Sequence, residues 1–517
     1  IIIGEIMEEV TPEERREAIL SIVAEYEEFL GETLKTSDKF EVNRLPPVIQ
    51  DSVKLVTAKS PAFSNISACT TVNYLFTHLV SQLRPVIMDI SYSPDSLGIN
   101  YYGINLATSG SGKDASLNTM KSACKTAFDM ILDVRKKNEE DRAKAIALHE
   151  KKKDDPNATE HDLDYSDYSE LIRELPPTSI EAKSTRGGAV NVITRMQNQQ
   201  FGNLGIVSNE FGLALKQNNT IEELLETLGS LFDMGVTEQQ AFKTVDVREQ
   251  SIEGMYPNTL MHSSPKIVFG NPKVRDAIFN LFHTMLARRC FLSMPSDRES
   301  IENNVVPTSI KEVRELANAR RVTVSTLSSK LDGITADVVR TMLADDLNRI
   351  VSFEEDAGEL YIDYFEYNLK KAELEEDSSI QQVELNGRAF KTARLAAMWS
   401  LMENSNRISK DILESAIYFA QYNSRYLEEF VLLASAKGYR LLGDKFKRGD
   451  LTQLSLDGAI VKGYVTAITN EFRELLDPMN SYLAKVGIVS YSQEDKTFYY
   501  SPFKMVEETG DYGISYT

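Results

Sequence analysis

The feature that most constrains the fold is a glycine-rich loop between an apolar run and a helical pattern. The apolar run is YYGINL at 101–106, the loop is ATSGSGKD at 107–114, and the pattern ASLNTMKSACKTAFDMIL occupies 115–132. A strand, a glycine-rich turn and a helix in this order place backbone amides where they can hold phosphate oxygens. The sequence therefore predicts an anion-binding loop in an α/β protein.

The residue types of the loop suit ATP. Gly110 and Gly112 allow the backbone to approach phosphate oxygens, and Lys113 is placed to bridge the β- and γ-phosphates. The alternative is a Gly-Ser turn followed by a surface lysine. The nucleotide contacts are expected from one continuous stretch: Thr108, Ser109, Gly110, Ser111, Gly112, Lys113, Asp114 and Ala115.

Two positions depart from the pattern GxxxxGK[ST] of ATP-binding loops. Ala107 replaces the first glycine, which is a mild change, and Asp114 replaces the hydroxyl residue that usually binds magnesium. A carboxylate beside a triphosphate adds repulsion unless a metal ion lies between them. Asp114 is therefore the more consequential departure.

A second acidic centre is expected on a neighbouring strand, and LGIVSNE at 204–210 is the best match. Glu210 would polarise the attacking water, and Asn209 stands where a metal-binding aspartate is usual. Asp114 and Asn209 thus reverse the usual pairing of a loop hydroxyl with a strand carboxylate. We expect Mg²⁺ at Asp114 and Asn209, with hydrolysis retained. The competing interpretation is a degenerate site that binds nucleotide and hydrolyses it poorly.

Three more residues are candidates for catalysis. The segment PKIVFGNP at 265–272 predicts a strand that ends at Asn271, which would sense the γ-phosphate or orient the water. The alternative there is a plain Asn-Pro turn. A helix that breaks into a short strand is predicted over 274–295, with Arg288 and Arg289 at the junction. One of them is a candidate arginine finger for a neighbouring subunit's nucleotide, and the alternative is an ordinary helix-end arginine.

Apolar strands alternate with helical patterns over much of the first 300 residues, which favours a parallel sheet. The predicted strands are 177–184, 203–208 and 265–270, and the predicted helices include 11–31, 64–83, 187–199 and 220–234. The sequence TRGG at 185–188 predicts a second glycine turn. Farther on, the patterns predict several short helices over 307–346, a hairpin within 347–365, two or three helices over 388–433, and a hairpin around SQED at 492–495 like the wing of a winged helix.

The chain divides into four predicted regions. They are an N-terminal helical collar (1–83), a core with the glycine loop (84–300), a helical region with a small hairpin (301–433), and a winged-helix-like domain with an acidic tail (434–517). A charged excursion at 130–175 interrupts the core. It is predicted to be a long solvated helix and a surface loop, with an interaction arm as the alternative.

Composition excludes several classes of protein. With 57 Lys+Arg and 77 Asp+Glu, the net charge of −20 argues against a general nucleic-acid coat, although a local basic groove is compatible with it. Three cysteines far apart exclude a disulfide framework and a strong zinc motif. No apolar run approaches the ~20 residues of a membrane span. We read no signal peptide, and these features predict a cytoplasmic protein without a membrane partner.

A local basic cluster interrupts this acidic composition near the C-terminus. Tyr439 and Phe446 interleave with it, which suits contact with a nucleic-acid backbone. A solvated basic face is the alternative. The predicted nucleic-acid residues are Lys437, Arg440, Lys445, Lys447 and Arg448.

With these residues in view, the chain resembles the P-loop ATPases of bacteriophages and mobile elements that are described as replicative helicases or primase-helicase-like proteins. The resemblance covers about residues 45–433. It rests on the order of LPPVIQDSVKLVTAKSPAF, the SGSGK loop, LGIVSNEFG, LARRCFLSMP and the helices of RAFKTARLAAMWSLMENSNRISKDILESAIYFAQ.

The resemblance implies a RecA/AAA-like ATPase core, often a hexameric ring around single-stranded or forked DNA, with ATP between subunits. Family roles correspond to Lys113, Glu210 and Arg288. No primase centre is recognisable, so a primase or a loader would be a separate partner. Two other functions remain open: a regulatory or defence ATPase that does not unwind DNA, and an origin-binding or loading protein with a relic loop.

Overall fold

A computed structural model describes most of the chain between Thr11 and Ser435. The described residues are 11–37, 39–88, 96–108, 110–181, 186–217, 220–236, 252–295, 309–375, 377 and 379–435, with three strands at 453–455, 490–492 and 497–499. All structural statements below concern these residues.

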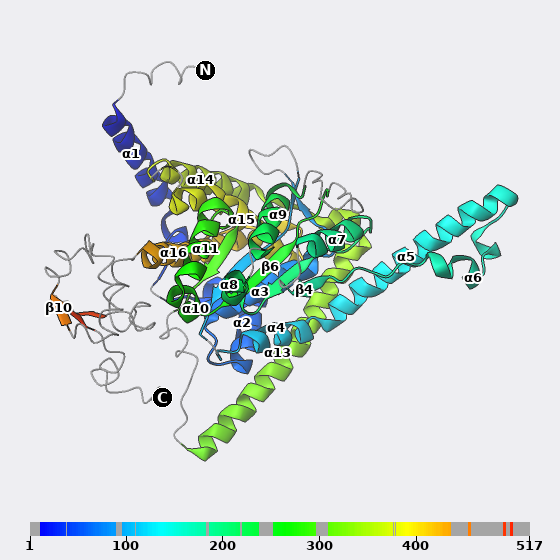
Figure 1. Cartoon of the computed structure of the whole chain (residues 1–517), viewed down its shortest axis with the longest axis horizontal. Coiled ribbons are helices and arrows are strands. Elements are labelled where there is room, and N and C mark those ends of the chain that lie inside the picture. The colour runs from blue at the N-terminus through cyan, green and yellow to red at the C-terminus, as the bar shows by residue number, and fades with distance from the viewer. Residues whose placement is uncertain are drawn as a thin grey trace.

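A five-stranded parallel sheet forms the centre of the molecule (Figure 1). Its strands are β3 (Tyr102–Leu106), β4 (Ser179–Glu181), β5 (Gly205–Ser208), β6 (Asn258–Ser263) and β7 (Cys290–Ser293). Their order across the sheet is β4-β5-β6-β3-β7. Every residue of β3, β5, β6 and β7 is buried, as expected where helices cover both faces of a parallel sheet.

Helices cover both faces of this sheet. Alternate residues of β3 point to opposite faces: Asn105 bonds to Ser67 on one side, and the hydroxyl of Tyr102 donates to the carbonyl of Leu228 on the other. The first face carries α2 (Pro47–Lys59), α3 (Asn65–Ser81) and α4 (Lys113–Ala123). The second face carries α7 (Arg186–Gln197), α8 (Phe211–Gln217), α9 (Thr220–Met234), α10 (Pro265–Gly270), α11 (Pro272–Leu281) and a π-helical turn at Phe282–Leu286.

A smaller sheet joins the first third of the chain to the last. Its strands are β1 (Val86–Ile87), β2 (Leu97–Gly98), β8 (Ile350–Phe353) and β9 (Arg407–Ile408), in the order β2-β1-β8-β9. Four long helices surround it: α13 (Ile310–Ala344), α14 (Glu355–Ala372), α15 (Ile380–Met402) and α16 (Lys410–Ser435). One continuous hydrophobic core extends from Ile19 to Ala434. The predicted boundaries at 83/84 and 300/301 therefore do not separate independent cores.

Several predicted helices are confirmed. Helix α1 (Pro12–Leu30) begins after Thr11, whose side chain forms a capping box with Glu14, and ends at Gly31. Helices α3 and α9 match the patterns at 64–83 and 220–234, and α15 and α16 match the pattern at 388–433.

Four local predictions are wrong. The segment 265–270 forms helix α10 and not a strand, because Ser264 caps its N-terminus and Pro265 occupies the first turn. The strand lies earlier, at β6. The TRGG turn is also wrong in part, since Arg186 already begins α7.

The region after 300 contains the other two corrections. The short helices expected over 307–346 are one 35-residue helix, α13, and the hairpin expected over 347–365 is strand β8 followed by α14. Glu355 and Asp356 sit in the first turn of α14, where acidic side chains are favourable and where the sequence resembled a turn.

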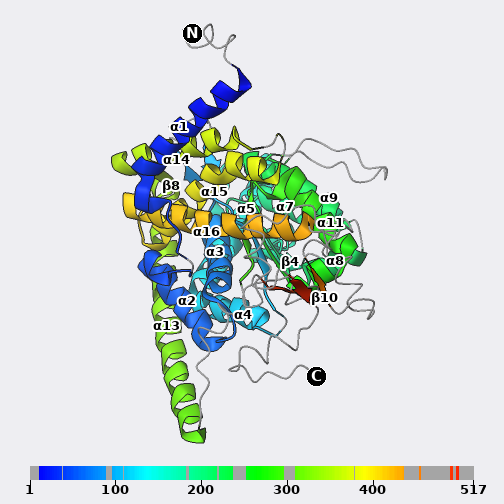
Figure 2. The same cartoon turned by 90° about the vertical axis from the view of Figure 1, so that its left-hand side faces the viewer.

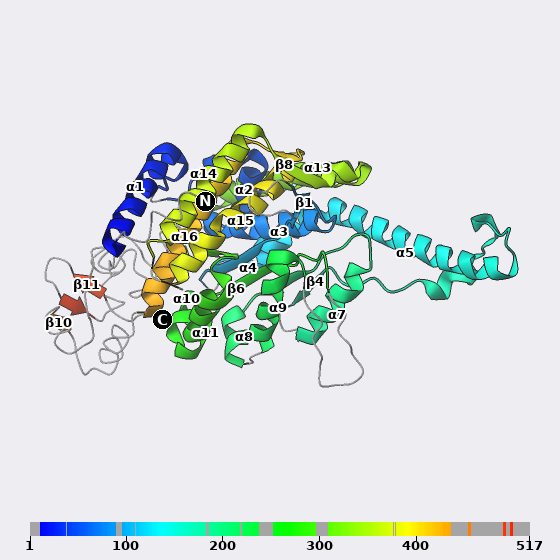
Figure 3. The same ribbon diagram turned by 90° about the horizontal axis from the view of Figure 1, so that it is seen from above.

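Two helices project from the body of the molecule. Helix α5 (Lys125–Asp154) extends to one side, as Figure 3 shows, and α6 (Tyr165–Tyr168) folds back against its outer part (Figure 1). The N-terminal half of α13 projects in another direction (Figure 2). The long helix predicted within 130–175 is thus confirmed, and it stands clear of the body as an arm.

The C-terminal region is described only as three short antiparallel strands. They are β10 (Gln453–Ser455), β11 (Ser490–Ser492) and β12 (Thr497–Tyr499). The pairing of β11 with β12 confirms the hairpin around SQED, and the winged helix stays a prediction. Among the described residues, no helix has the length and apolarity that crossing a lipid bilayer requires.

Candidate phosphate-binding site

The glycine loop connects the carboxyl end of β3 to the first residue of α4, Lys113. Gly110 and Gly112 have φ angles of +82° and +103°, in the region that favours glycine. A Cβ atom on Gly112 would lie 2.7 Å from the Cβ and Oγ atoms of Ser60. Gly112 therefore satisfies both a backbone conformation and a close approach of the loop to the α2–α3 turn.

A set of buried polar atoms at this edge has no hydrogen-bond partner among the described residues. The set comprises Lys113 Nζ, Ser111 Oγ, Ser263 Oγ and both ring nitrogens of His262. Lys113 is 9% exposed, and His262 is fully buried. Burying such groups without partners costs several kcal/mol, on the order of 1–3 for each. A bound anion would supply the missing partners.

His262 reaches the site because β6 lies beside β3. Asn105 pairs with His262 and Leu106 with Ser263 in the register of the two strands. Burial and the nearby charge of Lys113 lower the pKa of His262 to about 3, so its imidazole is neutral. His262 was not among the predicted site residues, because the strand was predicted seven residues too late, at 265–270. The signal was present in TLMHSS, an apolar run that ends in polar residues.

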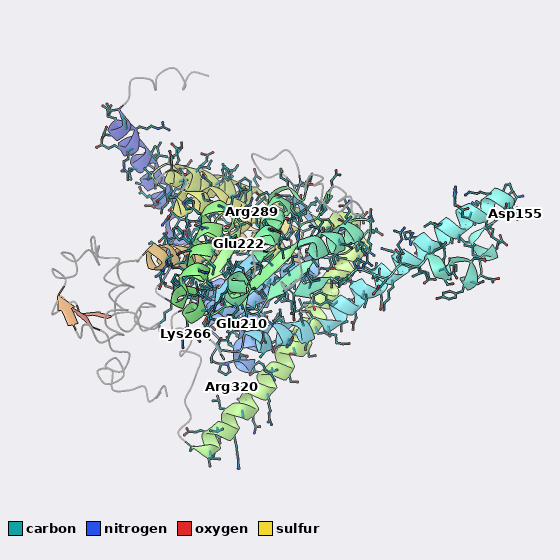
Figure 4. All side chains as sticks on the ribbon, in the orientation of Figure 1. Asp155, Glu210, Glu222, Lys266, Arg289 and Arg320 are labelled. Atoms are coloured by element: carbon teal, nitrogen blue, oxygen red, sulfur yellow. The ribbon has the colours of Figure 1, made fainter. Side chains whose placement is uncertain are left out.

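Two carboxylates lie close enough to Lys113 to affect its pKa. Burial lowers the pKa of Lys113, and the carboxylates of Glu210 and Asp114 act in the opposite direction. Asp114 is exposed in the first turn of α4, and Glu210 is exposed in the turn between β5 and α8 (Figure 4). The predicted loop lysine and strand-end glutamate are therefore brought to the same edge of the sheet.

The sheet topology has a switch point at this edge. The connection after β3 passes over the α3 face to β4, whereas the connection after β6 passes over the α8 face to β7. Adjacent parallel strands whose connections leave on opposite faces are where α/β sheets bind ligands. Leu106 and Ser263, which end these two strands, lie at this point.

Asn209 and Asn271 occupy different settings. Asn209 is exposed directly after β5, beside Glu210, as predicted. Asn271 follows helix α10 and caps α11, where its side chain accepts a hydrogen bond from the amide of Lys273. The placement of Asn271 at a strand end was therefore wrong, and β6 ends instead in His262 and Ser263.

Arg288 and Arg289 lie at the opposite, amino edge of the sheet, immediately before β7. Five residues of β3 separate the two edges by about 17 Å. Arg289 is buried and paired with Asp233 of α9, and the Nη2 atom of Arg288 lies 2.7 Å from the same carboxylate. Neither side chain is placed to reach the glycine loop of its own chain.

The remaining predicted site residues lie at the ends of the loop or outside the described ranges. Thr108 and Ala115 are exposed at the two ends of the loop. No group of three or more His, Cys, Asp or Glu side chains within the described ranges could hold a metal ion by itself. The predicted residues outside the described ranges are Ser109 of the loop and Lys437, Arg440, Lys445, Lys447 and Arg448 of the basic cluster.

The fold and this edge define an α/β protein with a parallel central sheet and, at a strand end, a glycine loop whose buried lysine makes no hydrogen bond to a described residue. No protein-family model matches the chain, and no curated protein sequence matches it.

Proposed function

We propose that this chain binds ATP at the glycine loop and hydrolyses it. The observation that supports this most strongly is the convergence of buried, unpartnered polar atoms on the loop: Lys113 Nζ, Ser111 Oγ and the ring of His262. A helix N-terminus alone would be a weak argument. A buried ammonium group and a buried neutral imidazole without partners point to an anionic ligand of several oxygens.

Each residue at this edge has a role in ATP binding or hydrolysis that follows from its position. Loop amides and Lys113 hold the phosphates, and Lys113 neutralises charge that develops on the γ-phosphoryl oxygens. His262 is neutral and can donate a hydrogen bond to the γ-phosphate or to the attacking water. Glu210, exposed two strands from the loop strand, is the candidate to orient that water and accept its proton.

Magnesium would be held by few protein ligands. Mg²⁺ in nucleotide sites commonly takes one or two carboxylates and completes its shell with phosphate oxygens and water, so a protein cage is not required. Asp114 and Asn209 are the candidate ligands, both exposed at this edge. The ion would neutralise phosphate charge and offset the repulsion between Asp114 and the triphosphate.

We further propose that hydrolysis drives movement along DNA in a ring of identical subunits, with a hexamer as the expected ring. The arginines before β7 support action between subunits: Arg288 is 46% exposed and lies at the edge away from its own loop. It can therefore act only on the nucleotide of another copy. DNA contact is proposed for the basic cluster at 437–448.

Phosphate release from ATP tests the proposal. We expect Mg²⁺-dependent turnover that single-stranded DNA stimulates, and a loss of at least a hundredfold in Lys113→Ala. Lys121→Ala is the matched control, because Lys121 is an exposed lysine on the same helix. Equal turnover in Lys113→Ala and Lys121→Ala would refute hydrolysis at this site. Turnover that DNA leaves unchanged would refute the DNA motor and leave the ATPase.

The second candidate function is a nucleotide-dependent switch that binds ATP and barely hydrolyses it. Asp114 favours it, since a carboxylate replaces the hydroxyl ligand of magnesium. Asp114→Asn separates the two functions. A motor that uses Asp114 as a metal ligand loses turnover and shifts its magnesium dependence, whereas a switch gains ATP affinity because repulsion is removed.

A further inference from the structure

The N-terminal half of α13 leaves the body of the molecule with little of its surface covered (Figure 2). All buried residues of this helix lie in its second half, between Leu331 and Met342. The free part, from Ile310 to Thr323, is about 21 Å long, because Val324 and Leu327 already pack against the core. This part continues a helix whose second half is packed, and a partner surface that covers its apolar side chains would remove them from water.

The apolar stripe of α13 continues past the body. Leu331, Ile334 and Val338 pack into the core at heptad spacing. The same spacing continues upstream through Leu327, Val324, Arg320, Ala317 and Val313. On this stripe Ile310 and Val313 are 73% and 48% exposed, whereas Val324 and Leu327 pack against the core; Val322, 66% exposed, lies on the opposite face of the helix. An exposed apolar stripe of this kind indicates a protein partner rather than solvent or a phosphate backbone.

The charge of the free half of α13 limits the kind of partner surface that it can bind. Residues 310–323 contain four basic and two acidic side chains, a net charge of +2 within a chain of −20. Arg314, Arg320 and Arg321 make no ion pair with another residue that the structure describes. The partner surface should therefore be acidic and partly apolar.

Helix α1 offers a surface that is acidic and partly apolar. Its 19 residues contain six glutamates and two arginines, a net charge of −4. Leu20, Ile22 and Phe29 are 47%, 37% and 71% exposed on it, and Ile22 and Phe29 lie on one face because they are seven residues apart. Glu25 and Glu28 are also exposed on this helix.

We propose that the free half of α13 in one copy of the chain docks on the exposed face of α1 in a second copy. The two helices lie at opposite ends of the molecule (Figures 1 and 2), so one copy cannot satisfy both surfaces by itself. A contact between two different surfaces is head-to-tail and generates a ring or a filament. The inference stands apart from ATP hydrolysis, because neither helix supplies a residue of the glycine loop.

Cysteine cross-linking tests the pairing directly. The native cysteines are all buried, so Phe29→Cys and Val313→Cys introduce the reactive thiols. We expect a covalent dimer under mild oxidation only when the two variants are mixed, and none from either alone. A dimer formed by one variant alone would mean a symmetric contact and overturn the proposal, as would no dimer in the mixture.

Charge reversal measured by light scattering gives a second, independent readout. Arg314→Glu with Arg321→Glu, or Glu25→Lys with Glu28→Lys, should weaken assembly about tenfold or more, and the four changes together should restore part of it. Lys136→Glu with Lys137→Glu on α5 is the matched control. A monomeric wild type at all concentrations would overturn the proposal. So would a reversal on α13 that abolishes DNA binding and leaves the mass unchanged.

Discussion

Single residues at the glycine loop combine burial with unused bonding capacity. Lys113 and His262 are both buried, and each has polar atoms without a hydrogen-bond partner among the described residues. Their proximity also shapes their chemistry, since the ammonium of Lys113 helps to keep the His262 imidazole neutral. His78, on α3, is neutral for a similar reason, because burial lowers its pKa to about 3.

The two buried histidines predict a pH dependence of stability. Their pKa values in the folded chain lie below the unfolded value of about 6.5, so the unfolded chain binds more protons as the pH falls. The free energy of unfolding should decrease from pH 6.5 towards pH 3, by up to about 1.4 kcal/mol per pH unit for each histidine. Urea unfolding at pH 7.0, 6.0 and 5.0 measures the slope. His78→Gln should reduce this change in the free energy of unfolding per pH unit, and the exposed His283→Gln should not. The same slope in both variants would contradict a role for buried, neutral His78.

Gly112 gives a second prediction at this scale. Gly112→Ala should destabilise the chain by about 1–3 kcal/mol and weaken ATP binding, because the new methyl group meets Ser60 at a positive φ. Gly110→Ala is the matched control, since its φ is also positive but no atom lies within 4 Å of the new Cβ. Adding Ser60→Gly should recover part of the loss in Gly112→Ala. No recovery in thermal unfolding would show that the contact with Ser60 is not the cause.

Among the elements, α15 links the helical part of the chain to the amino edge of the large sheet. Lys391 donates hydrogen bonds to the carbonyls of Ala287 and Cys290, on either side of the two arginines. Gly387 lies so close to Arg288 that a Cβ atom there would be 2.3 Å from the Cβ of Arg288. The orientation of Arg288 therefore depends on a helix a hundred residues away in the sequence.

A buried ion-pair cluster holds α15 in this place. Glu384 receives hydrogen bonds from Arg388 at 2.9 Å, and its other oxygen lies 2.8 Å from Lys391. Glu384→Gln should cost about 3–5 kcal/mol in urea unfolding, because it leaves two cations buried with reduced compensation. Asp129→Asn, which breaks an exposed pair with Lys125, is the control and should leave the midpoint unchanged. An equal loss of stability in Glu384→Gln and Asp129→Asn would contradict a stabilising role for the buried ion-pair cluster.

The same cluster adds an acid-side prediction. These cations and their hydrogen bonds lower the pKa of Glu384 to about 2, against the opposing effect of burial. Its contribution to stability is present above pH 4.5 and is lost as the pH falls towards 2. Unfolding of wild type and Glu384→Gln should therefore converge in that range; a constant difference would argue against an ionised Glu384.

At the scale of the whole molecule, one large core is accompanied by a separate small one on the α5 arm. The small core consists of Ala143, Ala147 and Tyr168, with Leu163 and Leu171 packed against it. It shares no residue with the core that extends from Ile19 to Ala434. Two cores of unequal size predict two units of different stability.

Tyr168→Ala tests this division. Tyr168 packs against α5, its hydroxyl contacts Glu140, and its ring lies below the Lys144 ammonium. The variant should release α6, raising proteolysis between 155 and 172 at least tenfold while the melting temperature of the body stays constant. Tyr165→Ala, at an exposed tyrosine of the same short helix, is the control. A large fall in the melting temperature would show that arm and body unfold together.

The glycine loop, α1 and α9 could be predicted from the sequence. Their signals are glycine positions, helix caps and apolar spacing, which act over a few residues. The cap of α1 at Thr11 and the positive φ angles of Gly110 and Gly112 depend on residue types within a few positions along the chain. Lys113 and Glu210 were predicted from the same kind of signal, and the structure brings them to one edge of the sheet.

Tertiary contacts decided what local signals left ambiguous. The apolar run PKIVFG suits a strand or a helix, and the cap at Ser264 together with packing beside α8 makes it helix α10. His262 acquired its place because β6 inserts between β5 and β3, and β3 lies more than 150 residues before β6 in the chain. The sequence by itself determined the loop and its lysine, since their geometry is local. Strand order decides which residues lie beside Lys113. It depends on which apolar surfaces pack together, and that packing exists only in the folded chain.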